Sequence, residues 1–185
     1  MRSLPHLLRL VCCGALACAT TACGPSEDNE RVVDAITVAA DQVYDAIETD
    51  STWLVNSAAG AEVVGTLTGA GEMSVVGWRT GAEQSTATGY HLSFAERLEL
   101  TFNNWPAADV TLNGSMVLTR HSLDLGPDET QITEASRTTV YQGQVTATGS
   151  ATGSFNIDVH GSASGNLLWT CGTVNDEPYG VGACY

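Results

Sequence analysis

The chain has 185 residues, and its 21 acidic residues against seven arginines, with no lysine, give a net charge of −14. A length of this order suits one domain that can bury a sizeable core. Such an acidic surface repels the phosphate backbone of nucleic acids, which excludes DNA and RNA as partners. It also offers no basic patch for anionic lipid headgroups, so a membrane contact would have to come from an attached lipid.

Residues 1–22 have the three-part layout of a secretory signal peptide. A basic start with Arg2 and Arg9 is followed by an apolar stretch, residues 10–19, and by small residues. The apolar stretch is shorter than the roughly 20 residues that span a bilayer as a helix, so we expect cleavage and not a permanent anchor. The mature part then keeps five arginines against all 21 acidic residues, a net charge of −16.

Ala22-Cys23-Gly24 ends the leader with a small residue directly before a cysteine. This ending resembles the lipobox of bacterial lipoproteins, in which the cysteine receives diacylglycerol; Cys18, which also follows small and apolar residues, is the alternative. The resemblance implies a lipoprotein of the bacterial cell envelope that carries palmitate-type acyl chains on Cys23. It would be held at the outer membrane, with the periplasmic or surface side left open. Residues 23–30 are expected to form a lipidated tether, and residues 31–185 a single domain.

Beyond Cys23 the mature part has two cysteines, Cys171 and Cys184. The turn-rich stretch between them predicts a hairpin centred between Glu177 and Pro178, in which the two cysteines face each other. Opposed residues of an antiparallel pair lie close enough for a disulfide, and an oxidising compartment favours its formation. We therefore expect a Cys171–Cys184 disulfide, which would stabilise the fold by about 3 kcal/mol in the chain-entropy model.

Residues 31–49 repeat apolar side chains at steps of three and four, with acidic residues between them. This is the period of an amphipathic helix, which we expect to be capped by Asp28 or Asn29. The apolar positions are Val32, Ile36, Ala40, Val43 and Ile47. The stripe could pack on the domain's own sheet, which we favour, or bind a partner.

After Trp53 the apolar residues recur with period 2, which indicates antiparallel strands with one dry and one wet face. Clusters of Gly, Asn, Asp and Pro, such as residues 103–106 and 161–165, predict turns between them. We expect strands at 61–68, 72–80, 86–93, 96–103, 109–120, 130–137, 138–149, 153–161 and 166–174, and a short tenth at 181–185. The predicted fold is mainly β: an antiparallel meander of about 9–10 strands forming a curved sheet, half-barrel or sandwich, with one N-terminal helix.

Few residues point to chemistry. Asn156, Asp158 and His160 share one strand face, and Asp158 with His160 is a weak candidate for a metal site; period-2 alternation alone also places polar residues on a solvent face. His91 and His121 are isolated in sequence and could meet other groups only in space. The sequence has no metalloprotease, phosphate-loop or nucleophile-elbow motif. We therefore assign no catalytic residue and no cofactor, and expect a protein that is not an enzyme.

The four tryptophans carry a further signal in a chain that is only 6% aromatic. We expect Trp53, Trp78, Trp105 and Trp169 in the core, whereas exposed aromatic residues on a β face would stack on sugars or partners. The leading hypothesis is a lipid-anchored envelope protein whose sheet binds an apolar ligand or an envelope protein. The alternative is a surface structural or adhesive module, and a hydrolase ranks last. A large apolar cavity would favour the first, and a filled core the second.

Overall fold

The computed structural model describes residues 25–57, 60–86, 89–128, 131–164 and 167–180. Across these ranges the chain forms helix α1 (Glu27–Thr49), a short 3-10 helix η1 (Ser51–Trp53) and nine strands. The strands are β1 (Leu54–Ser57), β2 (Gly60–Thr68), β3 (Glu72–Thr86), β4 (Gly89–Ala107), β5 (Val110–Gly126), β6 (Glu134–Gly149), β7 (Gly153–Ser164), β8 (Leu167–Val174) and β9 (Glu177–Gly180).

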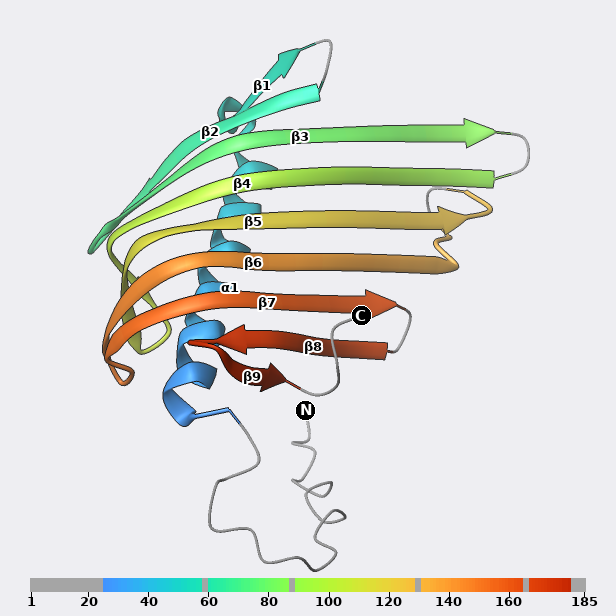
Figure 1. Ribbon diagram of the computed structural model, residues 1–185. Coiled ribbons are helices and arrows are strands. Elements are labelled where there is room, and N and C mark those ends of the chain that lie inside the picture. Colours follow the sequence, from blue (N-terminus) through green and yellow to red (C-terminus); the bar gives the residue numbers. More distant parts are fainter. Residues whose placement is uncertain (1–24, 58–59, 87–88, 129–130, 165–166, 181–185) are drawn as a thin grey trace, which may run out of the picture.

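The strands form one antiparallel sheet in which neighbours in sequence are neighbours in space, from β1 through β9 (Figure 1). The connections contain no helical crossover in the described part of the chain, and a meander is the simplest arrangement for such strands. Among the same residues, β1 pairs only with β2 and β9 only with β8, so the sheet is open. The prediction of a mainly β meander with one N-terminal helix is confirmed, as a single curved sheet.

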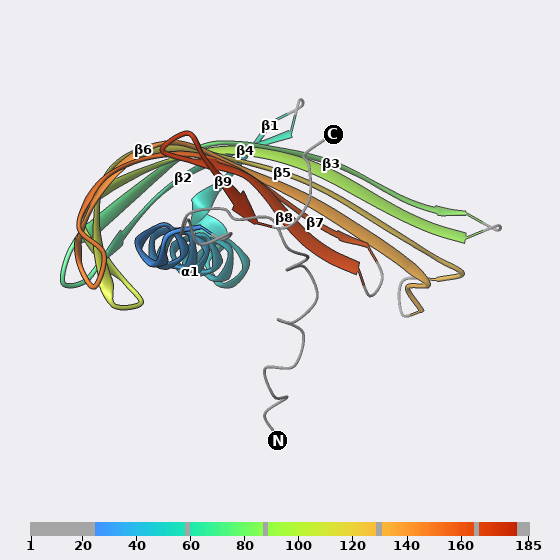
Figure 2. The same ribbon diagram turned by 60° about the horizontal axis from the view of Figure 1, so that its bottom comes forward.

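The sheet arches over α1, which lies on its concave side (Figure 2). The helix crosses the strands from one edge of the sheet to the other. Near its start, Asn29 Nδ2 donates a 3.2 Å hydrogen bond to Glu177 Oε2 of β9. Just after its end, the Trp53 ring lies against Gly65 of β2, so closely that an added Cβ would come within 2.3 Å of the ring. One helix therefore covers the concave side, while β3 to β6 continue beyond it (Figure 1).

The apolar stripe of α1 packs on the sheet, as the sequence predicts. Its five positions, Val32, Ile36, Ala40, Val43 and Ile47, are at most 3% exposed. Ala35 and Ala39 are fully buried beside them, and their small side chains let the helix lie close to the strands.

The start of α1 differs from the prediction. The helix begins at Glu27, and Ser26 is its cap, since the Ser26 hydroxyl accepts a hydrogen bond from the Asn29 N–H. Neither Asp28 nor Asn29 is the cap. Acidic residues in the first turn are favourable because the free N–H groups there carry partial positive charge. The expected tether at residues 23–30 therefore overlaps the first turn of the helix.

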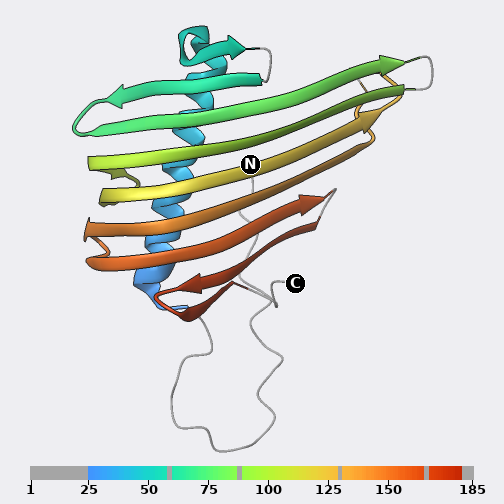
Figure 3. The same cartoon turned by 45° about the horizontal axis from the view of Figure 1, so that its top comes forward.

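The long strands place their apolar residues on the concave face. Leu98, Leu100 and Phe102 of β4, Leu112, Met116 and Leu118 of β5, and Phe155, Ile157 and Val159 of β7 are at most 4% exposed. Together with the stripe of α1 they form one continuous core. We call the opposite face of the sheet, which α1 does not cover, the outer face (Figure 3).

The central strands are longer than predicted. The strands expected at 86–93 and 96–103 are one strand, β4, and those expected at 130–137 and 138–149 are replaced by the single strand β6. The short β1, which was not predicted, precedes the first expected strand. Residues 161–165 are not all turn, because β7 continues to Ser164.

The cluster at residues 103–106 is a bulge and not a turn. The register between β4 and β5 shifts between Phe102 and Trp105. Asn104 has a φ of 51°, and its N–H donates a 2.8 Å hydrogen bond to Asn113 Oδ1 on β5. A side chain thus replaces the missing ladder partner, so the strand bends here without ending.

The β8–β9 hairpin turns earlier than predicted. Asn175 and Asp176 are its two turn residues, with φ values of 54° and 63°. Two residues with positive φ match the twist of the flanking strands, which favours this tight turn. Cys171 therefore pairs with Gly180, and the predicted centre between Glu177 and Pro178 is wrong.

Candidate functional site

A row of residues in register crosses the middle of the outer face. Each residue stands directly opposite the next on the adjacent strand, from β3 to β8, so the side chains share one face. This central row consists of Thr80, Ala95, His121, Thr138, Ser162 and Trp169. Thr80 is an odd number of residues from the buried Val75, which places the row on the side opposite the core.

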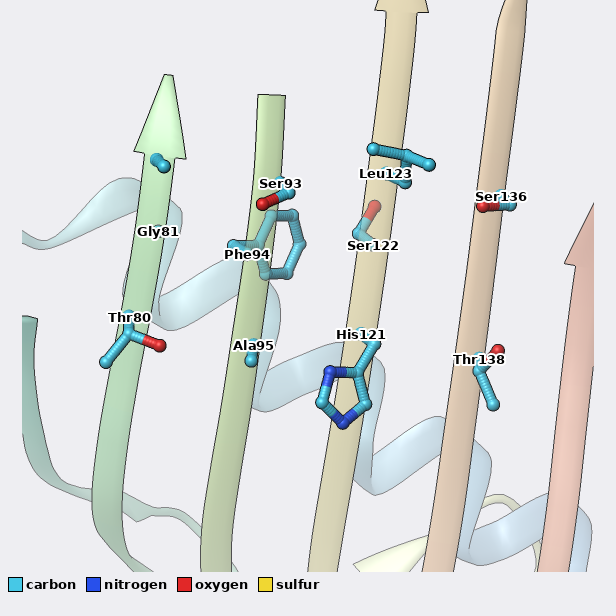
Figure 4. Close-up of a pocket in the computed structure, with 11 residues that line it drawn as sticks. Thr80, Gly81, Ser93, Phe94, Ala95, His121, Ser122, Leu123, Ser136 and Thr138 are labelled. Atoms are coloured by element: carbon cyan, nitrogen blue, oxygen red, sulfur yellow. The ribbon is translucent and has the colours of Figure 1, made fainter. Parts of the chain in front are cut away.

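An open trough runs along the central row. Between β3 and β6 it has a volume of about 510 Å³, and small residues such as Ser93 and Ala95 line it (Figure 4). A second depression of about 530 Å³ adjoins it at Thr80 and is lined by Glu62 and Trp78. Small side chains between taller ones create the hollow, so the face is channelled and not flat.

Trp78 and Trp169 lie on the outer face and are 44% and 42% exposed. Trp78 is on β3, beside the second depression, and Trp169 ends the central row on β8. The prediction that all four tryptophans are core residues is therefore wrong for these two. It is confirmed for Trp53 and Trp105, which are both 7% exposed, and Trp105 Nε1 donates a 3.1 Å hydrogen bond to Gln42 Oε1.

The two rows of the trough lack acidic and arginine side chains among the described residues, although the protein is acidic. The next row along the strands contains Ala82, Ser93, Leu123, Ser136 and Ser164. In this row and the central row, the described residues include no Asp, Glu or Arg, and most are Ser or Thr. Ionic side chains flank the two rows: Glu62 and Arg97 lie on either side of Trp78 in its own row, and Glu134 lies two residues before Ser136 on β6. The face therefore offers hydroxyl groups and aromatic rings to a ligand.

A second unusual site lies on the concave face, where the cover of α1 ends. Glu96 of β4 is fully buried and forms ion pairs with Arg79 of β3 and Arg120 of β5. Arg120 Nε lies 2.8 Å from Glu96 Oε2, but the geometry leaves both atoms without a hydrogen bond. Two guanidinium groups thus share one carboxylate at the boundary of the core.

Aromatic rings complete this ionic cluster. The guanidinium carbon of Arg120 lies 3.5 Å from the ring centre of Tyr44 on α1 and 4.8 Å from that of Phe94 on β4. Stacking on two rings compensates part of the cost of burying the charge. Burial raises the pKa of Tyr44, whose hydroxyl finds no hydrogen-bond partner among the described residues, and also raises the pKa of Tyr141 nearby. The cluster joins α1 to three strands, and its role is to position these elements.

The ionic cluster is absent from the sequence-based predictions, although the sequence contains a signal for it. Glu96 has the same parity as Leu98 and Leu100, and Arg120 has the parity of Met116 and Leu118. A charged residue at a core position of an otherwise alternating strand must be paired or exposed. Two such residues on consecutive strands, opposite in sign, predict an ion pair.

The weak metal candidates come together but form no centre. His160 Nε2 lies 3.2 Å from Asp158 Oδ1, and Asp158 also accepts a 3.0 Å hydrogen bond from Gln142 Nε2. Over the described residues, no three His, Cys, Asp or Glu side chains are placed to hold a metal ion. His91 and His121 both lie on the outer face. Their rows are two steps apart along the strands, so the two imidazoles are not brought together.

The cysteine predictions stay predictions. Cys18 and Cys23 lie outside the described residues, as do Cys184 and the strand expected at 181–185. Cys171 is described, and it is 1% exposed even though its register with His160 places it on the outer face. The burial of Cys171 suits a disulfide with Cys184 but does not test it.

No protein-family model, curated protein sequence or solved structure matched this chain. In the stretches that the structure describes, α1 and η1 are the helices, and neither is long and apolar enough to cross a membrane. The outer face and the ionic cluster therefore have to be interpreted from their own chemistry.

Proposed function

We propose that the protein is a non-enzymatic module of the bacterial cell envelope, anchored by a lipid on Cys23, that uses its outer face to contact an envelope component. One observation carries this proposal. The helix packs against the strongly curved part of the concave side, while the outer face keeps an open trough with Trp78 and Trp169 exposed. Large aromatic side chains are costly to leave in water and are enriched where proteins bind partners.

The filled core favours this proposal over an apolar-ligand carrier. A carrier needs room between helix and sheet, and side chains from both occupy that space. Ile36 and Val43 of α1, like Leu100 of β4, are fully buried in the same cluster. A ligand could enter the space between helix and sheet only by displacing α1, which would expose this apolar surface to water.

The anchor would set the orientation of the outer face. Cys23 is three residues before the cap Ser26, so the lipid would lie within roughly 11 Å of the start of α1. That end of the helix is next to β9, and the opposite end is next to β2. The strands from β8 to β3 would then lie at increasing distance from the membrane, with the trough running outward.

The contact is tested by sedimentation with envelope membranes. The mature chain with Cys23→Ala, which cannot carry the anchor, is mixed with membranes from a host that lacks the gene. We expect it to sediment with them, and the double variant Trp78→Ala, Trp169→Ala to stay in solution. Val38→Ala is the matched control, because it removes an apolar residue that is 38% exposed on α1, away from the outer face. Absence of binding, or binding that the double variant retains, would overturn the proposed contact.

The anchor has its own test. Intact-mass analysis of the native protein is expected to find a diacylglyceryl group on Cys23, and Cys23→Ala should release the protein from membranes. Cys18→Ala is the control and should leave the protein anchored. Release by Cys18→Ala alone would assign the lipid to Cys18, and a protein found without lipid would contradict the anchor.

A further inference from the structure

We infer that the trough of the outer face is a binding site for a neutral, unbranched glycan. This inference rests on the proposed function and names the chemistry of the component that the outer face contacts. It depends on three observations: an exposed indole ring on the outer face to either side of the trough, Trp78 on β3 and Trp169 on β8, hydroxyl side chains in the rows between them, and no Asp, Glu or Arg among the described residues of those rows.

The two tryptophans provide the apolar part of such a site. A pyranose ring has C–H groups on its faces and hydroxyl groups around its rim. The C–H face packs on an indole ring, because the electron-rich face of the indole attracts the weakly positive hydrogens. Trp78 and Trp169 are each more than two-fifths exposed, so a ring that stacks on them removes apolar surface from water.

The side chains between them provide the polar part. The hydroxyl groups come from four strands, β3, β4, β6 and β7: Thr80, Thr138 and Ser162 in the central row, and Ser93 and Ser136 in the next row. A hydroxyl group donates one hydrogen bond and accepts others, and it can rotate to suit its partner. Such a surface pairs with the rim of a sugar without demanding a charge on it.

Charge decides between glycan classes. The mature chain has a net charge of −16, which repels uronic acids, sulfated sugars and phosphorylated sugars over the whole surface. A cationic polymer would find acidic partners, but the two rows of the trough hold none among the described residues. A neutral ligand carries no charge that would have to leave water when the ligand enters the trough.

The dimensions favour an extended ligand. Trp78 and Trp169 are on β3 and β8, five strand spacings apart, which corresponds to about 24 Å. A monosaccharide can contact only one of the two rings, whereas an oligosaccharide of several units can contact both. The affinity is therefore expected to rise with chain length until both tryptophans are engaged.

The experiment is titration calorimetry of the mature chain with cellohexaose, chitohexaose and maltohexaose, and with the matching disaccharides. We expect at least one hexasaccharide to bind, and its disaccharide to bind at least about tenfold more weakly. Trp78→Ala and Trp169→Ala should each weaken hexasaccharide binding by about tenfold or more, and Val38→Ala should not. Circular dichroism of each variant checks that the exposed tryptophans can be replaced without loss of the fold.

A second readout comes from tryptophan fluorescence. Acrylamide quenches exposed indoles, here Trp78 and Trp169, more than the buried Trp53 and Trp105. A glycan in the trough should protect the exposed pair, and the double variant Trp78→Ala, Trp169→Ala should lose this protection. Binding that leaves the quenching unchanged would place the glycan elsewhere and overturn the inference.

The outcomes separate this inference from the proposed function. If the double variant loses envelope binding but no hexasaccharide binds, the outer-face contact stands and the glycan is wrong. Protease treatment of the membranes that abolishes wild-type sedimentation would then identify a protein partner. If neither membranes nor hexasaccharides bind, both proposals fail.

Discussion

Glu96 is the residue on which the ionic cluster depends. Its carboxylate is fully buried between Arg79 and Arg120, and Arg120 is only 5% exposed. Glu96→Gln keeps the shape of the side chain but leaves two guanidinium groups without a counterion. Removing one partner of a buried pair costs about 3–5 kcal/mol, so we expect a loss of this size in the free energy of unfolding.

Urea denaturation followed by circular dichroism measures this effect. Glu99→Gln is the matched control, because Glu99 lies on the same strand but on the exposed outer face, and its stability should change by less than about 0.5 kcal/mol. Equal effects of the two substitutions would mean that the buried ion pairs contribute nothing specific.

Tyr44 makes the stability sensitive to alkaline pH. Burial raises the pKa of Tyr44 above the ordinary value of 10.0, so the folded protein holds this proton at a pH where the unfolded chain releases it. The unfolded state is therefore favoured as the pH rises above about 10, and the stability, which is unaffected below that value, falls. We expect the fall in chemical denaturation midpoints between neutral pH and pH 11 to be smaller in Tyr44→Phe.

The same variant has a second expected effect at neutral pH. The Tyr44 hydroxyl is buried without a hydrogen-bond partner in the part of the chain that the structure describes, so removing it relieves an unsatisfied polar group. Tyr44→Phe should leave the stability unchanged or raise it by about 1 kcal/mol. A clear loss of stability at pH 7 would show that the hydroxyl is bonded in solution.

At the scale of elements, Gly65 determines how the end of α1 meets the sheet. The Trp53 ring, which follows the helix, lies on the backbone of Gly65, and no side chain fits between them. Gly65→Ala is expected to displace Trp53 and cost about 1–3 kcal/mol in thermal or urea unfolding. Gly69→Ala is the control, because an added Cβ there meets nothing within 4 Å. A neutral result for Gly65→Ala would mean that the ring moves aside freely.

The β8–β9 turn is a second element with a sharp expectation. Asp176 has a φ of 63°, a conformation that costs an ordinary residue about 1 kcal/mol or more and glycine almost nothing. Asp176→Gly should therefore raise the melting temperature. Asn175→Gly should gain less, because Asn175 Oδ1 accepts a 2.7 Å hydrogen bond from the Asn156 N–H, which the substitution removes. A lower melting temperature for Asp176→Gly would contradict the turn geometry.

At the scale of the whole molecule, charge repulsion opposes the compact state. The mature chain has five arginines against 21 acidic residues, and three of those arginines are already engaged in ion pairs with Glu27, Asp109 or Glu96. Raising NaCl shortens the screening length from about 30 Å at 0.01 M to about 8 Å at 0.15 M. We expect the free energy of unfolding to rise over this range, and a fall would mean that the ion pairs outweigh the net repulsion.

The open sheet also leaves two edges, which are formed in part by short strands. In the described ranges the edge strands β1 and β9 have four residues each, and β9 contains Pro178, which cannot donate a ladder hydrogen bond. Short edges with proline discourage pairing with a second sheet. The open edge also includes residues 81–86 of β3, which pair with β4 alone among the described residues.

Much of the fold could be predicted because its signals are local. The steps of three and four from Val32 to Ile47 specify a helix, and the alternation around Leu98 and Leu100 specifies strands with one buried face. Turn residues were harder to place. The asparagines at 103 and 104 look like a turn in sequence, yet pairing with β5 continues on both sides of them, so they form a bulge.

By itself, the sequence determined the helix, the meander order and the polarity of each strand face, since these follow from periodicity and from connections too short to cross the sheet. Only the tertiary structure decided which apolar residues are buried. Trp105 lies on the face that α1 covers and reaches Gln42, while Trp78 lies on the face that nothing in the described chain covers. Glu96 and Arg120 are different, because their alternation with core residues places both charges on the buried face, and the tertiary structure adds the rings of Tyr44 and Phe94 that stack on Arg120. Burial depends on what packs against a surface, and alternation along one strand contains no information about that.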